Sequence, residues 1–122
     1  MSQKNFEVRT THFVLPNETN HYGTLFGGIA LQYMDAVAFL AATRKFRKTF
    51  VTASSEKIDF KVPVKLGQMI ELLGKVIKKG RTSCTVQVEM FSEELLTGKR
   101  KLCTTGKFVM VSVDKNGHSR PL

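Results

Sequence analysis

The chain is poor in cysteine, and its two cysteines do not suit a metal site. Cys84 and Cys103 form no Cys-x-x-Cys pair, and no histidine stands at a ligand spacing from either. This argues against a bound zinc ion, and two cysteines are too few for a disulfide scaffold. We therefore expect no metal site and two buried, reduced thiols, as in a cytoplasmic protein.

Acidic residues are also scarce, because 10 Asp and Glu stand against 19 Lys and Arg and give a net charge of +9. Residues 1–43 carry a net charge of −1 and residues 44–122 one of +10. Hydrophobic residues make up 42%, which is too many for a disordered basic arm. The composition predicts one domain over residues 1–122, and a domain of this size gains stability from forming an oligomer.

The sequence lacks a clear targeting or membrane segment. Met1–Asn5 are not followed by the apolar core of a signal peptide. The longest apolar run, residues 25–42, contains Gln32 and Asp35, and a carboxylate at mid-bilayer costs at least ~2.5 kcal/mol. We therefore expect a helix that is buried inside a protein that does not enter the membrane.

The hydrophobic pattern predicts an α+β fold. A helix is expected from about Leu25 to Arg44 with Thr24 as its N-cap, and it is apolar on nearly every side, so it must be enclosed on most sides. A polar loop from Pro16 to Gly23 precedes it. Strands are expected over residues 5–15, 50–60, 69–78, 82–91 and 101–113. This order predicts one long central helix wrapped by a curved antiparallel sheet of about five strands.

Asp35 is the first candidate for a catalytic residue. It is the only acid between Glu18 and Glu56, and it lies in the middle of the most apolar element. Burying a carboxylate is costly, so such a residue is either a hydrogen-bonded structural acid or a functional one.

Gly27 and Gly28 strengthen the functional interpretation. At a helix start, their free N–H groups could hold an oxyanion. Eight residues of helix separate Gly27 from Asp35 by about 12 Å, too far for both to touch one reacting carbonyl. If both act on one carbonyl, they come from different chains, which predicts an obligate dimer with the site at its seam.

The sequence resembles the hotdog-fold acyl-CoA thioesterases, especially the YciA-like branch and the animal cytosolic acyl-CoA hydrolases. The resemblance rests mainly on the block from Asn20 to Gly28 (Asn-His-Tyr-Gly-Thr-Leu-Phe-Gly-Gly) and on Met34-Asp35. It continues in residues 51–54, 59–60, 80–83, 108–111 and 113–114, with Pro63 and Gly67, and covers nearly the whole chain.

The resemblance implies a hotdog domain that hydrolyses acyl-CoA to a fatty acid and CoA. It implies that Asp35 is the catalytic carboxylate, as nucleophile or general base, and that Asn20 reaches the site from the partner subunit. We expect no cofactor, since CoA is part of the substrate, and hexameric relatives make a trimer of dimers the first expectation.

Gly27 and Gly28 would polarise the thioester, and Arg81, Thr82 and Ser83 would bind the CoA phosphates. Phe26, Tyr33, Met34 and Phe39 could line an acyl tunnel, although packing in the core is their more ordinary role. A second interpretation is a non-catalytic module that binds acyl-CoA or another polyanion. Nucleic acid is not expected as a partner, because the basic residues lack interleaved aromatics and any known motif.

Overall fold

The computed structural model describes residues 6–122, so the expectations for Met1–Asn5, including the absent signal peptide and the strand start at Asn5, lie outside it. Its elements in chain order are β1 (Phe6–Phe13), a short 3-10 turn η1 (Pro16–Glu18), α1 (Gly27–Phe46), β2 (Phe50–Phe60), β3 (Met69–Lys79), β4 (Ser83–Glu93) and β5 (Arg100–Ser112). The expected loop from Pro16 to Gly23 therefore contains one turn of helix.

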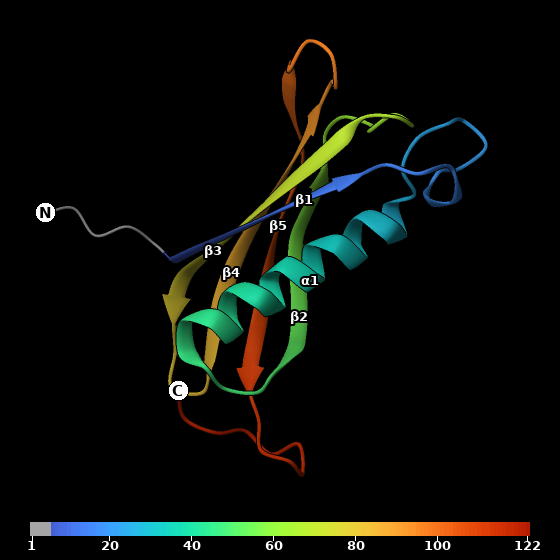
Figure 1. Cartoon of the computed structure of the whole chain (residues 1–122). Coiled ribbons are helices and arrows are strands. Elements are labelled where there is room, and N and C mark those ends of the chain that lie inside the picture. Colours follow the sequence, from blue (N-terminus) through green and yellow to red (C-terminus); the bar gives the residue numbers. More distant parts are fainter. Residues whose placement is uncertain (1–5) are drawn as a thin grey trace, which may run out of the picture.

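The five described strands form one antiparallel sheet in the order β1-β3-β4-β5-β2. The sheet curves around α1, which lies along its concave face (Figure 1). This confirms the predicted α+β layout of one long helix and a wrapped sheet. The chain order does not reveal that β2 crosses to the far edge, where it pairs with β5 alone.

The predicted start of the helix is wrong. α1 begins at Gly27, and Phe26, not Thr24, is its N-cap. Thr24 and Leu25 are extended instead, because Thr24 forms a β-bridge with Lys65 and the Leu25 N–H donates to the Val64 carbonyl at 2.8 Å. Two backbone donors that a helix start at Leu25 would leave free are thus used elsewhere, that of Leu25 by the loop before β3 and that of Phe26 by the Glu18 carbonyl.

The core lies between α1 and the sheet, where Met34, Val37, Ala38 and Ala41 are fully buried. The helix comes close to the sheet at Gly74 of β3, where a Cβ would lie 3.2 Å from the Val37 carbonyl oxygen. Small residues on both elements therefore bring α1 against β3.

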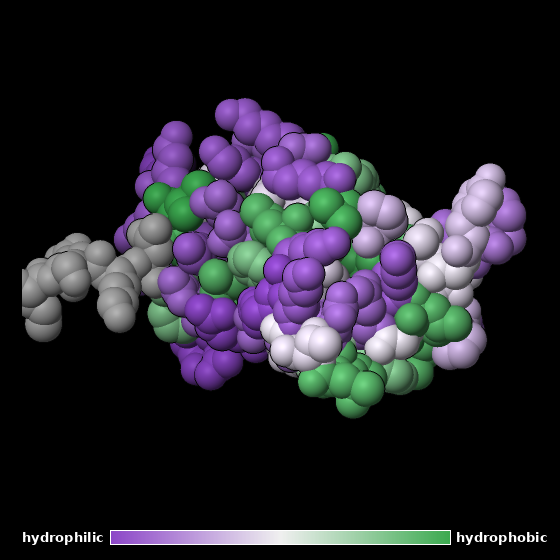
Figure 2. Space-filling model, turned by 90° about the horizontal axis from the view of Figure 1, so that it is seen from above, coloured by the Kyte–Doolittle hydropathy of each residue, from purple (hydrophilic) through white to green (hydrophobic). Residues whose placement is uncertain are grey.

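The opposite face of α1 is not enclosed by its own chain. Phe39 is 42% exposed and Leu40 37% exposed, and most of the neighbouring β2 is exposed along its length. Seen from above, apolar residues reach the surface in several patches among hydrophilic ones (Figure 2). The sheet of this chain therefore encloses α1 on the side of the core and leaves this face open.

Two further expectations concern the cysteines and the membrane. Cys84 and Cys103 are buried free thiols, as expected, and burial raises the pKa of Cys84 to about 11. Among residues 6–122, no helix combines the length and the apolar character needed to span a bilayer.

Candidate active site

Asp35 lies half-buried in the middle of α1, on the side that faces the start of β2. The Thr52 hydroxyl of β2 donates a hydrogen bond of 2.5 Å to Asp35 Oδ1. The carboxylate is therefore less buried than the apolar sequence around it suggested. Within residues 6–122, this neutral hydroxyl is the one donor that orients the carboxylate, and no cation pairs with it.

Asn20 lies in the loop between η1 and α1, and its side chain organises that loop. Its Oδ1 accepts hydrogen bonds from the backbone N–H of Tyr22 at 2.9 Å and from the N–H and hydroxyl of Thr24. Its own backbone N–H donates to the Thr24 carbonyl at 2.8 Å. The amide oxygen is thus occupied by the loop, which makes the amide NH₂ the part of this side chain suited to meet a ligand.

A contact between Glu18 and Tyr33 ties this loop to α1. The Tyr33 hydroxyl and the Leu15 N–H both donate to the Glu18 carboxylate, and the Phe26 N–H donates to the Glu18 carbonyl. The bond from Tyr33 holds the pKa of Glu18 below its usual value and, with burial, raises the pKa of Tyr33 to about 12. Glu18 is two residues from Asn20 and Tyr33 two from Asp35, so this pair fixes one candidate region relative to the other.

Gly27 and Gly28 are the first two residues of α1, and both are exposed. The first intrahelical bond is that of Ala30, whose N–H donates to the Phe26 carbonyl, so the N–H groups of both glycines have no helical acceptor. No atom lies within 4 Å of the place that a Cβ of Gly28 would occupy. The predicted pair of accessible donors at the helix start is therefore present.

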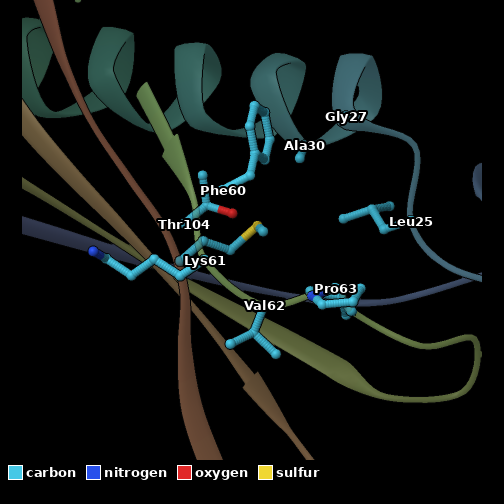
Figure 3. Close-up of a pocket in the computed structure, with 10 residues that line it drawn as sticks. Leu25, Gly27, Ala30, Phe60, Lys61, Val62, Pro63 and Thr104 are labelled. Atoms are coloured by element: carbon cyan, nitrogen blue, oxygen red, sulfur yellow. The ribbon is translucent and has the colours of Figure 1, made fainter. Parts of the chain in front are cut away.

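A cavity of about 250 Å³ opens beside Gly27, and most of its lining is apolar. The ring of Phe60 points toward α1 next to Ala30, and the ammonium of Lys61 points away (Figure 3). The lining residues are Leu25, Gly27, Ala30, Phe60, Lys61, Val62, Pro63, Val64, Met90 and Thr104. None of the four residues considered for an acyl tunnel lines this cavity: Met34 is buried in the core, Phe26 and Phe39 are exposed, and Tyr33 binds Glu18.

Arg81, Thr82 and Ser83 lie at the turn between β3 and β4, as expected. The Gly80 N–H donates to the Ser83 carbonyl at 2.7 Å and closes the turn. Arg81 is exposed, and Thr82 and Ser83 are half-buried. This turn lies at the end of the sheet where α1 finishes (Figure 1), so the candidate phosphate-binding residues are far from Gly27.

Within one chain, the structure places Asp35 beside Thr52, and it places Asn20 in the loop that leads to Gly27, where its side chain bonds to Thr24. It does not bring Asp35 and Thr52 together with Asn20 and Gly27, because eight residues of α1 separate Gly27 from Asp35.

Thr52 received no role in the sequence analysis, although its segment belongs to the resemblance. No spacing rule links a threonine on a strand to a helix residue 17 positions earlier. Only the packing of β2 beside α1 reveals the contact.

Comparison with known proteins identifies the family. The family model described as "Thioesterase superfamily" matches residues 22–99. The uncharacterised acyl-CoA thioester hydrolase YkhA of Bacillus subtilis is 36% identical over 119 residues, which cover 98% of this chain and 69% of that protein.

Solved structures of similar fold indicate the same family. A hexameric acyl-CoA thioesterase superposes with a TM-score of 0.91 and 43% identity, covering 96% of this chain and 75% of that one. The acyl-CoA hydrolase of Staphylococcus aureus, solved with butyryl-CoA and CoA, gives 0.89 and 26%, covering 96% and 71%. Three single variants of that enzyme were also solved, with alanine in place of a threonine, of an aspartate or of an asparagine.

The helix wrapped by a five-stranded sheet, the family match over residues 22–99 and the identity with YkhA lead to one conclusion: the chain belongs to the thioesterase superfamily and has the hotdog fold.

Proposed function

We propose that this chain hydrolyses acyl-CoA thioesters to a free acid and CoA. The observation that carries the proposal is the Asp35 carboxylate, held by Thr52 on the exposed side of α1, in a chain whose helix start offers two accessible N–H donors. A carboxylate and a pair of amide donors are the two elements that thioester hydrolysis by water requires.

The roles follow from the chemistry of the groups. Asp35 acts as general base and takes a proton from water while the water oxygen bonds to the thioester carbon. The N–H groups of Gly27 and Gly28 stabilise the oxyanion that forms. The carbon–sulfur bond then breaks, and the departing thiolate receives the proton. The thiolate of CoA is a good leaving group, so no strong acid is required, and no cofactor beyond the CoA of the substrate is invoked.

Thr52 is a positioning residue in this scheme, because its hydroxyl orients the carboxylate without contacting the substrate. The S. aureus variants support the assignment of Asn20, Asp35 and Thr52. Their replaced asparagine, aspartate and threonine are spaced 15 and 17 residues apart, as Asn20, Asp35 and Thr52 are here.

We further propose that each site is shared between two copies. Asp35 would come from one copy, and Asn20, Gly27 and Gly28 from the other, since α1 keeps Gly27 and Asp35 apart within a chain. The seam would include Phe39, Leu40 and β2, where Val51 is 49% exposed. An edge strand presents a row of unpaired backbone groups, which native proteins normally cover or pair. The hexameric thioesterase with a TM-score of 0.91 supports assembly into a homo-oligomer, with a trimer of dimers as the first model.

The apolar cavity beside Gly27 would take part of the substrate. At about 250 Å³ it is smaller than the ~300–1,000 Å³ of typical ligand pockets, so it suits one apolar portion of an acyl-CoA and not the whole molecule. At the other end of the sheet, Arg81, Thr82 and Ser83 would meet phosphates of the CoA moiety.

Thiol release from a panel of acyl-CoAs tests the function. We expect turnover of at least one chain length and a loss of about 10²–10⁴-fold in kcat for Asp35→Asn. Asn20→Ala should also lower kcat, and Thr52→Ala should lower it more than Thr52→Ser does. Glu7→Gln, on the opposite edge of the sheet, is the matched control. Absence of thiol release from every substrate, with CoA still bound, would instead support the non-catalytic binding module.

Molar mass in solution tests the shared site. Val51→Glu places a charge in the proposed seam and should yield monomers without activity. Leu96→Glu makes the same change at a fully exposed position in the loop between β4 and β5 and should leave the mass unchanged. A monomeric wild-type protein with full activity would refute the shared site.

A further inference from the structure

A second cavity of about 250 Å³ lies at the end of α1 opposite to Gly27. It is bounded by the residues that follow α1, by the end of β5 and by the segment after it. Its lining residues are Arg47, Lys48, Thr49, Ser112, Val113 and Arg120. Backbone bonds define its frame: the Val113 N–H donates to the Thr49 carbonyl at 2.9 Å, and the Arg120 N–H to the Ser112 carbonyl at 2.8 Å.

The lining of this cavity is strongly basic. Arg47, Lys48 and Arg120 contribute three cations, and no acid is among the lining residues. None of these cations forms an ion pair within the described part of the chain. The neighbouring acid Asp114 accepts hydrogen bonds at Oδ1 from the backbone N–H groups of Asn116 and His118, and its Oδ2 lies 3.8 Å from His118 Nδ1. Among residues 6–122, no carboxylate therefore pairs with the three cations that line the cavity.

Ser112 lies at the floor of the cavity. Among the lining residues it is the buried one, at 1% exposed, so its hydroxyl stands behind the exposed cations. Arg47 is also held in the left-handed conformation, at φ 55°, which non-glycine residues adopt rarely.

We propose that this cavity binds a phosphate group. Arg offers a fork of donors to phosphate oxygens, Lys a mobile point charge, and the Ser112 and Thr49 hydroxyls further neutral donors. The partial negative charge at the C-terminal end of α1 opposes an anion, but it amounts to about half a charge against three full cations.

The position of the cavity suggests two sources for the phosphate. The Ser112 N–H donates to the Thr82 carbonyl and the Leu122 N–H to the Arg81 carbonyl, both at 2.9 Å, so the cavity adjoins the turn that carries Arg81. The phosphate is therefore either the 3′-phosphate of the CoA moiety or that of a separate nucleotide. The first source rests on the proposed function, and the second does not.

Calorimetric titration of the oligomeric protein with CoA, dephospho-CoA, ADP and inorganic phosphate separates these sources. The variants are Arg120→Gln and Lys48→Gln, both at exposed side chains, and Ser112→Ala at the buried hydroxyl. Lys101→Gln removes the same charge at the far end of β5 and is the control. Circular dichroism establishes that each variant is folded.

If the cavity holds the 3′-phosphate, Arg120→Gln and Lys48→Gln weaken CoA binding about tenfold each and leave dephospho-CoA binding unchanged. If it holds a separate phosphate, the same variants keep the CoA affinity and lose binding of ADP or inorganic phosphate. Unchanged affinity for all four probes, or an equal loss in Lys101→Gln, would overturn the proposal. Binding requires no turnover, so a protein that hydrolyses no acyl-CoA would still give a decisive result.

Discussion

The N–H of Gly27 can be removed without disturbing the helix that begins there. Gly27 is the first residue of α1, the position at which proline is most favourable. Phe26 before it has φ −59° and ψ 136°, the extended conformation that a following proline requires. Gly27→Pro therefore deletes one donor from the proposed oxyanion site and leaves the helical hydrogen bonds in place.

The effect should fall on catalysis and hardly on stability. Loss of one oxyanion donor lowers kcat by about 10²–10³-fold, or ~2.7–4 kcal/mol of transition-state stabilisation. The free energy of unfolding should change by less than ~1 kcal/mol, because the lost N–H has no acceptor in the helix. A Cβ at this position would lie 3.7 Å from Phe60 Cζ, an ordinary contact.

Gly27→Ala is the matched control, because it adds the same Cβ beside Phe60 and keeps the N–H. Steady-state thiol release gives kcat and KM, and urea denaturation gives the free energy of unfolding. We expect kcat within about threefold of wild type for Gly27→Ala. Equal losses in the two variants would assign the effect to the Cβ in the cavity, and a Gly27→Pro enzyme with normal kcat would refute the role of this donor.

Two further predictions concern the stability of the scaffold. Tyr33→Phe should lower the free energy of unfolding by about 1 kcal/mol near neutral pH and lower kcat through a looser Asn20 loop. The pKa of Glu18 is lowered in the fold, so its contribution is present above its ordinary value of 4.5 and lost as the pH falls below it. The pKa of Tyr33 is raised to about 12, so its contribution is present below 10.0 and lost as the pH rises toward 12. Denaturation measured across pH should thus show wild type and Tyr33→Phe converging at both extremes, and a constant gap would contradict the assignment. Gly74→Ala should cost about 1–3 kcal/mol, because its Cβ would press on the Val37 carbonyl oxygen at 3.2 Å. Gly28→Ala, where a Cβ meets nothing within 4 Å, should not destabilise the protein. An equal loss of unfolding free energy in Gly74→Ala and Gly28→Ala would show that packing of Gly74 against α1 does not explain the effect.

The secondary structure was largely predictable from local pattern, and the arrangement of the strands was not. The alternation of Cys84, Val86, Val88 and Met90 with polar residues predicts a strand, and β4 covers it. The pairing of β2 with β5, across the whole sheet from β1, depends on contacts between distant residues. The start of α1 was misplaced for a similar reason, since the Val64 carbonyl takes the Leu25 N–H from a segment far along the chain.

In the candidate site, too, some residues could be predicted from local sequence and others could not. The apolar run around Asp35 singled out that carboxylate, and the glycine pair indicated free backbone donors. The role of Thr52 could not be predicted from the sequence, because it depends on how β2 lies beside α1. The basic cavity at Arg47 and Arg120 could not be predicted from the sequence either, since these residues are 73 positions apart and meet beside the end of β5.

The separation of Gly27 from Asp35 leads to a test that only a shared site passes. In a symmetric dimer, each of the two sites takes Asp35 from one copy and the glycines from the other. A mixed dimer of Asp35→Asn and Gly27→Pro chains then has one doubly damaged site and one intact site. About half of the dimers are mixed when the two inactive variants are unfolded and refolded together in equal amounts, so activity should return to about a quarter of the wild-type value. If Asp35 and Gly27 instead served one site within a chain, every site would stay damaged, and the mixture would be no more active than its parts.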